Sequence, residues 1–375
     1  MTQKILKVKN GEIPEAVQEF LKDLLKEKKV SALLVMQPMP SKKTAFPVLI
    51  SDPHHLHANV FSPVLPVSTA KLVSKMTKIQ PAKQPIGVVM HPCQICALIE
   101  LAKLNQANLE NLIIIGVDCL GTFSLNTYTD FPEKKKRTTY LLDAYTQKTK
   151  DAEKYLRTAC LVCKDPIPTN ADIVIGLHGM DIGNELLIEA HTDAGKKLLE
   201  GLNLEPAKDI KEHREKAIKA YREEQAKRQE AFIKEKNVKI KGIKALTEFF
   251  DKCINCKNCM HACPICYCRE CLYESSVFDA EAYKFLRKAD VKGLVKMPND
   301  TLLFHLGRMN HMILSCVECG LCEQACPSNI PLMEIFIPAA ENAQQEFKYN
   351  PGKDSKEKIP MIVYREDEYK EVGEA

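Results

Sequence analysis

The chain of 375 residues contains no tryptophan and no apolar run long enough to cross a membrane. Its longest apolar runs, such as residues 112–117, fall far short of the roughly 20 residues that a transmembrane helix needs. The first ten residues, MTQKILKVKN, have neither the apolar core nor the cleavage site of a signal peptide, so we expect a cytoplasmic protein. The net charge of +4 is small against 53 basic and 49 acidic side chains, which gives no reason to expect nucleic-acid binding.

Cysteine, in contrast, is abundant, and its distribution divides the chain. Of the 16 cysteines, five precede residue 164, none lies between residues 164 and 252, and the others crowd into residues 253–326. The cytosol keeps thiols reduced, so this many cysteines predict metal binding rather than disulfides. We therefore expect a metal-binding module that follows a larger domain.

Residues 1–204 alternate between strand-like and helix-like stretches, which predicts an α/β domain. The expected strands are residues 30–36, 46–51, 86–90, 112–117, 172–176 and 185–190. The expected helices are residues 14–26, 68–78, 95–104 and 193–202. Residues 205–241 have no glycine and are rich in Glu, Lys, Arg, Gln and Ala, which are strong helix formers. We predict that residues 205–245 contain one long, charged, mostly solvated helix that links two domains.

Two copies of one cysteine motif lie in the last third of the chain. Residues 253–264 read CINCKNCMHACP and residues 316–327 read CVECGLCEQACP. Both follow C-x2-C-x2-C-x3-C-P, a pattern typical of [4Fe–4S] ligation in bacterial ferredoxins, where the cysteine before proline ligates the other cluster. A zinc site is the alternative, but it needs four ligands and has no use for a duplicated run.

The motif spacing thus predicts two [4Fe–4S] clusters with crossed ligand sets. The first set is Cys253, Cys256, Cys259 and Cys326. The second set is Cys316, Cys319, Cys322 and Cys263. We expect residues 246–340 to form an α+β ferredoxin-like domain with two clusters and an insertion, followed by a C-terminal tail at residues 341–375.

The insertion of about fifty residues between the two motifs carries three further cysteines, Cys266, Cys268 and Cys271. Neither cluster needs them, and we favour small buried residues over additional ligands. Residues 304–312 place His305, Arg308 and His311 just before the second motif. We expect this stretch to be an amphipathic packing helix; the alternative is a set of donors that raises a cluster's reduction potential.

The N-terminal cysteines follow predicted strands. Cys93 and Cys96, in HPCQICALIE, come after residues 86–90 and open a helix, an arrangement that resembles a thioredoxin-type redox pair. Cys119 comes after residues 112–117, and Cys160 and Cys163 lie in TACLVC. Cofactors of α/β domains usually sit at strand ends, so several of these cysteines could converge on one cluster.

Four segments then carry a family resemblance in order: PCQICAL, GVDCLGTFS, residues 157–163 followed by ADIVIGLHG, and IEAHTDAGKKLLEGL. Together they resemble the beta-subunit family of coenzyme F420-reducing hydrogenase and formate dehydrogenase, over roughly residues 1–245. The resemblance implies a domain that binds FAD and one [4Fe–4S] cluster. It implies Cys93, Cys119, Cys160 and Cys163 as ligands of this third cluster, whereas Cys96 lies where no family ligand is expected.

The flavin leaves a weaker trace in the sequence. No G-x-G-x-x-G motif is present, so an ordinary Rossmann dinucleotide site is not supported. Gly176, Gly179 and Gly183 follow a predicted strand and could let the backbone approach a pyrophosphate. Ordinary turns explain the three glycines equally well, and His178 is either a turn residue or a flavin contact.

These observations predict an oxidoreductase subunit for electron transfer. A flavin accepts a hydride and releases electrons singly, and iron–sulfur clusters carry them singly. F420 or NAD(P)H would exchange a hydride with FAD, and the clusters would serve a formate dehydrogenase, a hydrogenase or a heterodisulfide-reductase-like complex. One alternative is a ferredoxin-like carrier or docking subunit without its own hydride substrate. Another is a thiol–disulfide reductase that uses Cys93 and Cys96.

Overall fold

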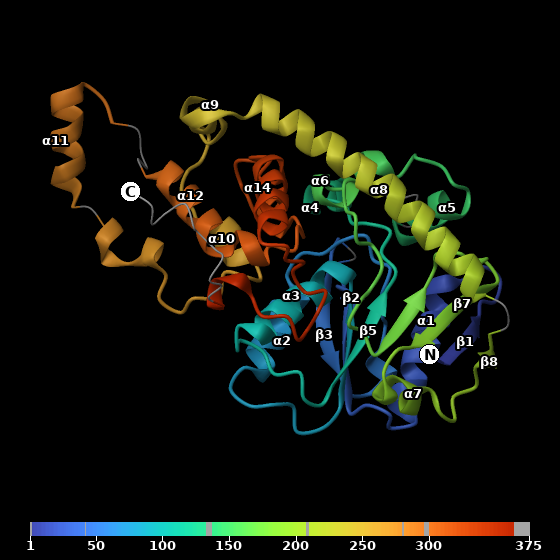
Figure 1. The fold of residues 1–375 in the computed structure, drawn as a ribbon. Coiled ribbons are helices and arrows are strands. Elements are labelled where there is room, and N and C mark those ends of the chain that lie inside the picture. Colours follow the sequence, from blue (N-terminus) through green and yellow to red (C-terminus); the bar gives the residue numbers. More distant parts are fainter. Residues whose placement is uncertain are drawn as a thin grey trace.

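The computed structural model describes residues 2–41, 43–132, 137–207, 210–279, 281–295 and 300–363. It consists of an N-terminal sheet covered by helices and a C-terminal helical region beside it (Figure 1). Of the predicted C-terminal tail at residues 341–375, residues 364–375 lie outside the described residues. Among the described helices, none is both long and apolar enough to cross a membrane.

One mixed sheet forms the N-terminal part, with strand order β3-β2-β4-β5-β6-β7-β1-β8. The strands are β1 (Thr2–Lys7), β2 (Ala32–Pro38), β3 (Ala45–Ile50), β4 (Ile86–Met90), β5 (Leu112–Val117), β6 (Ile173–Gly176), β7 (Glu185–Ala190) and β8 (Glu205–Pro206). β2, β4, β5 and β6 run parallel, so their carboxyl ends meet at one edge of the sheet. β3, β7, β1 and β8 pair antiparallel with their neighbours. The predicted α/β class is confirmed.

Helices cover both faces of this sheet (Figure 1). They are α1 (Ile13–Lys26), α2 (Thr69–Thr77), α3 (Pro92–Lys103), α4 (Leu125–Asp130), α5 (Arg137–Thr146), α6 (Thr158–Leu161) and α7 (Asp193–Leu199). The β-branched residues of β4 and β5 are almost all buried, as expected of parallel strands with helices on both sides. α3 begins at Pro92 rather than at residue 95, so Cys93 lies in its first turn.

A single helix, α8 (Lys211–Lys239), runs along the molecule from the sheet to the C-terminal helices (Figure 1). It lies within the predicted linker, but it is more than a solvated tether, because Arg214, Gln225, Gln229 and Lys236 are buried. At its start the Arg214 guanidinium donates to Asp118 Oδ2 at 2.8 Å and to Glu189 Oε2 at 2.9 Å. Near its end, Lys236 Nζ lies 3.0 Å from Glu334 Oε1. Both ends of α8 are therefore fixed by ion pairs.

The C-terminal region is helical in its described residues, and the predicted α+β class is wrong there. Its helices are α9 (Gly242–Phe249), α10 (Asn258–Ala262), α11 (Ala282–Lys292), α12 (Thr301–Met312), α13 (Leu321–Gln324) and α14 (Met333–Glu346). The cysteine motifs form turns that lead into the short helices α10 and α13, and the insertion forms α11 and α12. Consequently no described residue after β8 is in a strand.

The two regions share one apolar core. Ile95 and Ala159 of the N-terminal part belong to the same buried cluster as Met260, Met333 and Phe336 of the C-terminal part. Polar contacts add to it: Lys71 Nζ on α2 donates to the carbonyl oxygen of His261 at 2.7 Å and to those of Cys263 and Cys266 at 3.2 Å. The C-terminal helices are thus packed on the carboxyl-end edge of the sheet.

Candidate functional site

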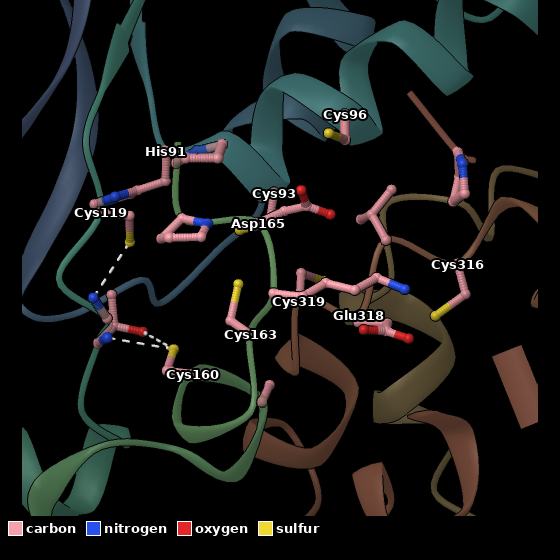
Figure 2. A pocket seen from close by; sticks show the side chains of 18 of the residues that line it. His91, Cys93, Cys96, Cys119, Cys160, Cys163, Asp165, Cys316, Glu318 and Cys319 are labelled. Carbon is pink, nitrogen blue, oxygen red and sulfur yellow. Dashed lines mark hydrogen bonds between the residues drawn. The ribbon is translucent and has the colours of Figure 1, made fainter. Parts of the chain in front are cut away.

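Four cysteines from three separate segments line one cavity of about 80 Å³ beside the carboxyl ends of β4 and β5 (Figure 2). Cys93 lies in the first turn of α3, directly after β4, and Cys119 follows β5. Cys160 lies on α6, and Cys163 follows that helix. We call Cys93, Cys119, Cys160 and Cys163 the N-terminal group. These are the residues that the family resemblance implies as ligands of one cluster.

Hydrogen-bond donors surround the sulfurs of this group. Gly121 N donates to Cys119 Sγ at 3.3 Å, and Thr122 N donates to Cys160 Sγ at 3.3 Å (Figure 2). Gly121 has a φ of +91°, and a Cβ there would lie 3.3 Å from the Cβ of Cys160. A glycine at this position therefore lets the loop after β5 approach α6 closely. Donors of this kind orient metal ligands and stabilise their ionised form.

Electrostatics also ties the group together. Burial raises the pKa of the Cys93, Cys119 and Cys163 thiols, and the charges of the other thiols in the group raise each pKa further. Thiols whose ionisation is opposed by their neighbours in this way need a strongly positive group between them before they can become thiolates. Iron in a cluster supplies that charge, so the donor set is suited to an iron–sulfur cluster.

Cys96 stands apart from the group although it lines the same cavity. It lies one helical turn after Cys93 and is only 5% exposed, and a Cβ on Gly352 would lie 2.3 Å from its Cα. Burial raises the pKa of the Cys96 thiol to about 11. A redox-active pair needs an accessible thiol with a lowered pKa. The chain that covers Cys96 therefore argues against a thioredoxin-type pair with Cys93.

The first predicted ferredoxin set surrounds a second cavity, of about 20 Å³. Its residues, which we call the outer group, are Cys253, Cys256, Cys259 and Cys326. Three come from the first motif and one from the second, and α10 and α13 pack on each other to bring them together. His305 of α12 closes the cavity: its Nε2 lies 3.3 Å from Cys253 Sγ, and its ring stacks on Phe250 at 4.0 Å.

The remaining predicted set forms the middle group, Cys263, Cys316, Cys319 and Cys322. Burial raises the pKa of the Cys316, Cys319 and Cys322 thiols, and the nearby Cys263 charge raises it in each case. The pKa of Cys263 is lowered instead, chiefly by a hydrogen bond from Cys266. Cys263 thus lies with the three cysteines of the other motif, as the crossed pattern predicts.

The three groups are neighbours and form a row. Cys319 of the middle group lines the cavity of the N-terminal group, and the Cys93 charge raises the pKa of Cys319 (Figure 2). On the other side, the Cys322 charge of the middle group raises the pKa of Cys259 in the outer group. Cys256 at the far end is exposed to solvent. The row therefore runs from the edge of the sheet to the surface of the C-terminal region.

The glycines considered for a flavin have other neighbours. A Cβ on Gly176 would lie 2.8 Å from the Arg214 guanidinium, and a Cβ on Gly179 would lie 2.7 Å from the Arg214 Cα. Gly183 has open space around it, with only Asp181 Oδ1 at 3.7 Å. His178 is buried, and its Nδ1 lies 3.1 Å from Tyr145 Oη. Glycine is needed at positions 176 and 179 because α8 packs closely against them. These two glycines therefore no longer support a pyrophosphate site.

Two residues of the site could not be recognised from the cysteine motifs. Arg157 lies between the N-terminal group and Cys319, and its Nη2 donates to Cys160 Sγ at 3.6 Å. Glu318, between two cysteines of the middle group, is half-buried, and the burial of its carboxyl group raises its pKa to about 7. Neither follows from motif spacing, because their partners come from the other half of the chain.

Comparison with known proteins adds two family matches. The family described as the C terminus of the coenzyme F420 hydrogenase/dehydrogenase beta subunit matches residues 83–216, which include the whole N-terminal group. The family described as 4Fe-4S dicluster domain matches residues 248–330, which include the middle and outer groups. Each match therefore covers one of the two cysteine-containing regions.

Similar individual proteins extend over nearly the full length. The chain is 28% identical to the F420-dependent formate dehydrogenase subunit beta of Methanocaldococcus jannaschii, covering 93% of this chain and 94% of that protein. It is 29% identical to the F420-dependent formate dehydrogenase 1 subunit beta of Methanococcus maripaludis, covering 92% of each. A chain of the F420-reducing [NiFe] hydrogenase complex from Methanosarcina barkeri is similar in structure over 64% of this chain and 92% of its own, with 15% identity and a TM-score of 0.45. Over nearly its full length the chain is thus similar to F420-dependent formate dehydrogenase beta subunits, which are oxidoreductases; residues 83–216 match the coenzyme F420 hydrogenase/dehydrogenase beta-subunit family, and residues 248–330 match the 4Fe-4S dicluster domain.

Proposed function

We propose that the chain is the electron-transfer subunit of an F420-dependent formate dehydrogenase or hydrogenase, and that it binds one FAD and three [4Fe–4S] clusters. The observation that carries this proposal is the row of three neighbouring cysteine groups, which begins at the sheet and ends at an exposed cysteine. When bound, FAD would exchange a hydride with reduced F420 and pass single electrons to the clusters. A heterodisulfide-reductase-like complex is the alternative partner.

The chain's own residues would hold and shield the clusters. The N-terminal group would ligate the cluster nearest the flavin, and the backbone N–H groups of Gly121 and Thr122 would stabilise its thiolates. The middle group, mostly buried, would keep water away from the second cluster. The outer group would ligate the third cluster, with His305 beside Cys253.

Exchange with the partner subunit would take place at the outer group. Cys256 is exposed there, and the side chain of Ile254, which lines the same cavity, is 58% exposed. Apolar side chains exposed next to a redox centre are typical of a surface that another protein covers. The partner would carry the chemistry of formate or hydrogen, and this chain would accept or deliver the electrons.

Room for the flavin exists next to the N-terminal group. A cavity of about 290 Å³ is lined by residues 124–127, residues 154–158 and the segment around Asn329. Arg157 lines both this cavity and that of the N-terminal group. The volume of the cavity lined by residues 124–127 is close to the lower limit for known ligand sites, about 300 Å³. Lys154, which also lines it, offers a positive charge to a phosphate group. We propose that part of FAD binds here rather than at the glycines after β6.

The proposal is tested by adding reduced F420, NADH and NADPH in turn to the oxidised, anaerobically purified protein. We expect reduced F420 to bleach the flavin and then the cluster absorbance. Bleaching by NADH or NADPH alone would contradict the choice of F420. Protein with its full iron content but no FAD would instead support a ferredoxin-like carrier without its own hydride substrate.

The thiol–disulfide reductase alternative is tested with the Cys96→Ser variant. We expect this variant to keep its iron and its bleaching by reduced F420, because Cys96 lies outside the N-terminal group and is covered by Gly352. A loss of electron transfer with intact iron would favour disulfide exchange between Cys93 and Cys96.

A further inference from the structure

Two arginines are buried in the row of cysteine groups, at positions where no carboxylate of the described residues forms a hydrogen bond with them. Arg157, just before α6, is 7% exposed, and Arg308, on α12, is 2% exposed. In the part of the chain that the structure describes, no oxygen accepts a hydrogen bond from the Arg308 guanidinium. The same holds for Nε and Nη1 of Arg157, whose Nη2 donates to Cys160 Sγ. Arg214 is different, because its guanidinium is paired with Asp118 and Glu189.

A buried cation without a counter-charge is unfavourable, so negative charge must compensate these two arginines in the working protein. The groups that supply it are cysteines. Arg157 Nη2 donates to Cys160 Sγ at 3.6 Å, and Arg157 lines the same cavity as Cys93 and Cys319. Around the Arg308 guanidinium, which is buried against the Phe336 ring, the charged partners are the sulfurs of Cys322, Cys263, Cys259 and Cys266.

The positions of the two arginines follow the row. Arg157 borders the N-terminal group and also Cys319 of the middle group; a Cβ on Gly320 would lie 3.7 Å from its Nη1. Arg308 borders Cys263 and Cys322 of the middle group and also Cys259 of the outer group. The ring of Phe336, 4.7 Å from Arg308 Cζ, fixes that guanidinium from the other side. Each gap between neighbouring groups thus contains one arginine, and the middle group touches both.

We propose that Arg157 and Arg308 are the counter-cations of the two gaps between the clusters, and that the middle cluster, bordered by both, holds a transferred electron most stably. This inference rests on the proposed function, since it requires clusters at all three groups. Reduction adds one negative charge to a cluster, and a nearby cation or N–H donor stabilises the reduced form. In a buried site with little screening, this stabilisation is stronger than in water.

The test is a redox titration with dithionite, followed by electron paramagnetic resonance, on the whole anaerobically purified protein. Wild type is compared with Arg157→Met and Arg308→Met. We expect each substitution to lower the potentials of the two clusters it borders by about 59 mV or more, a tenfold change in the equilibrium for one electron. The reduction potential of the middle cluster should fall in both variants. The potential of the cluster at the N-terminal group should fall only in Arg157→Met, and that of the cluster at the outer group only in Arg308→Met. In wild type, the cluster that shifts in both should be reduced first.

The matched control is Arg228→Met. Arg228 lies on α8 and pairs with Glu153 and Glu224, the charged partners that raise its pKa. This substitution also removes one positive charge. The reduction potentials of the three clusters should nevertheless change by no more than a factor of two in the equilibrium constant for reduction. Potentials that are unchanged in the Arg157 and Arg308 variants, or that shift as much in the control, would overturn the inference.

Iron content separates this inference from the proposed function. Wild type with fewer than three clusters would refute the proposed function itself, whatever the arginines do. Should Arg308→Met lose a cluster, Arg308→Lys decides the matter. Retention of the cluster by the lysine variant would support a need for positive charge, whereas loss in both variants would make Arg308 a packing residue and overturn the inference.

Discussion

Cys263 and Cys266 lie three positions apart, yet their surroundings assign them different functions. Cys263 lies with Cys316, Cys319 and Cys322, whereas Cys266 is its hydrogen-bond donor. We predict that Cys263→Ser loses the middle cluster, about four irons per chain, and that Cys266→Ser keeps all of them. Iron analysis and electron paramagnetic resonance of both variants check this. Equal iron loss in the two variants would contradict the assignment and make Cys266 an alternative ligand.

His178 is predicted to make the sheet sensitive to acid. Burial lowers the pKa of His178 below its ordinary value of 6.5, although Asp118 opposes this and Arg214 adds to it. Above about pH 6.5 the histidine is neutral in both states, so its contribution to stability is complete; below that pH the unfolded chain takes up a proton first. The free energy of unfolding should therefore fall with acidification, by at most about 1.4 kcal/mol per pH unit from this group.

The corresponding measurement is thermal unfolding of wild type and His178→Gln at about pH 7.5 and about pH 5.5. The variant cannot take up this proton, so its unfolding midpoint should fall less than that of wild type over the interval. An identical fall in both proteins would show that His178 does not contribute to the acid sensitivity.

The spacing of the cysteines predicts much of the candidate site, because a cubane cluster imposes a ligand pattern that is written in consecutive residues. The positions of the two arginines between the groups could not be predicted in this way, although the sequence offers Arg308, as an alternative to a packing residue, as a donor near a cluster. Arg157 meets Cys319, and Arg308 meets Cys259 and Cys263, only after the two halves of the chain pack together. The same applies to Gly176 and Gly179, whose neighbour Arg214 lies on a helix that begins far along the chain.

The helix α8 is predicted to be held on the sheet by its first turn. Arg214 is buried between Asp118 and Glu189, and removing it would leave two carboxylates without their partner. We predict that Arg214→Met lowers the free energy of unfolding by about 3–5 kcal/mol, the usual effect of breaking a buried ion pair from one side. Chemical denaturation followed by circular dichroism measures this change.

The control for this prediction is Arg228→Met on the same helix. Arg228 is paired with Glu153 and Glu224 at the surface, so its loss should change the free energy of unfolding by no more than about 1 kcal/mol. Equal effects of the two substitutions would mean that the buried pair does not anchor α8.

Strands that lie inside the parallel part of the sheet could be predicted from the sequence, because they are continuous apolar runs rich in β-branched residues. β4 and β5 have the predicted bounds, as does the antiparallel strand β7 on the far side of β6. β1 and β8 were not predicted: β1 has the mixed sequence TQKILK, and β8 has two residues and depends on pairing with β1. The ferredoxin region was predicted to contain strands, but its described residues place helices from the insertion next to the motifs instead.

Removal of iron is predicted to affect the two parts of the protein differently. Most cysteines of the middle and outer groups belong to one apolar cluster with the C-terminal helices and with Ala159 and Val162, which flank Cys160 and Cys163. The cluster around α1, β2 and β7 contains no cysteine among its described residues. Metal binding supplies folding free energy where ligands would otherwise repel or remain unpaired. After anaerobic chelation we expect hydrogen exchange to become faster in residues 157–163 and 248–330 and to stay slow in α1 and β2. Uniformly faster exchange would contradict this division.

The most direct test of an FAD and three-cluster electron-transfer subunit is the cofactor content of the anaerobically purified protein, measured together with its reduction by F420. We predict about twelve irons and one FAD per chain, with flavin and cluster absorbance both bleached by reduced F420. A protein with about eight irons, no flavin and no response to reduced F420 would contradict the proposal, because the N-terminal group would then ligate no cluster.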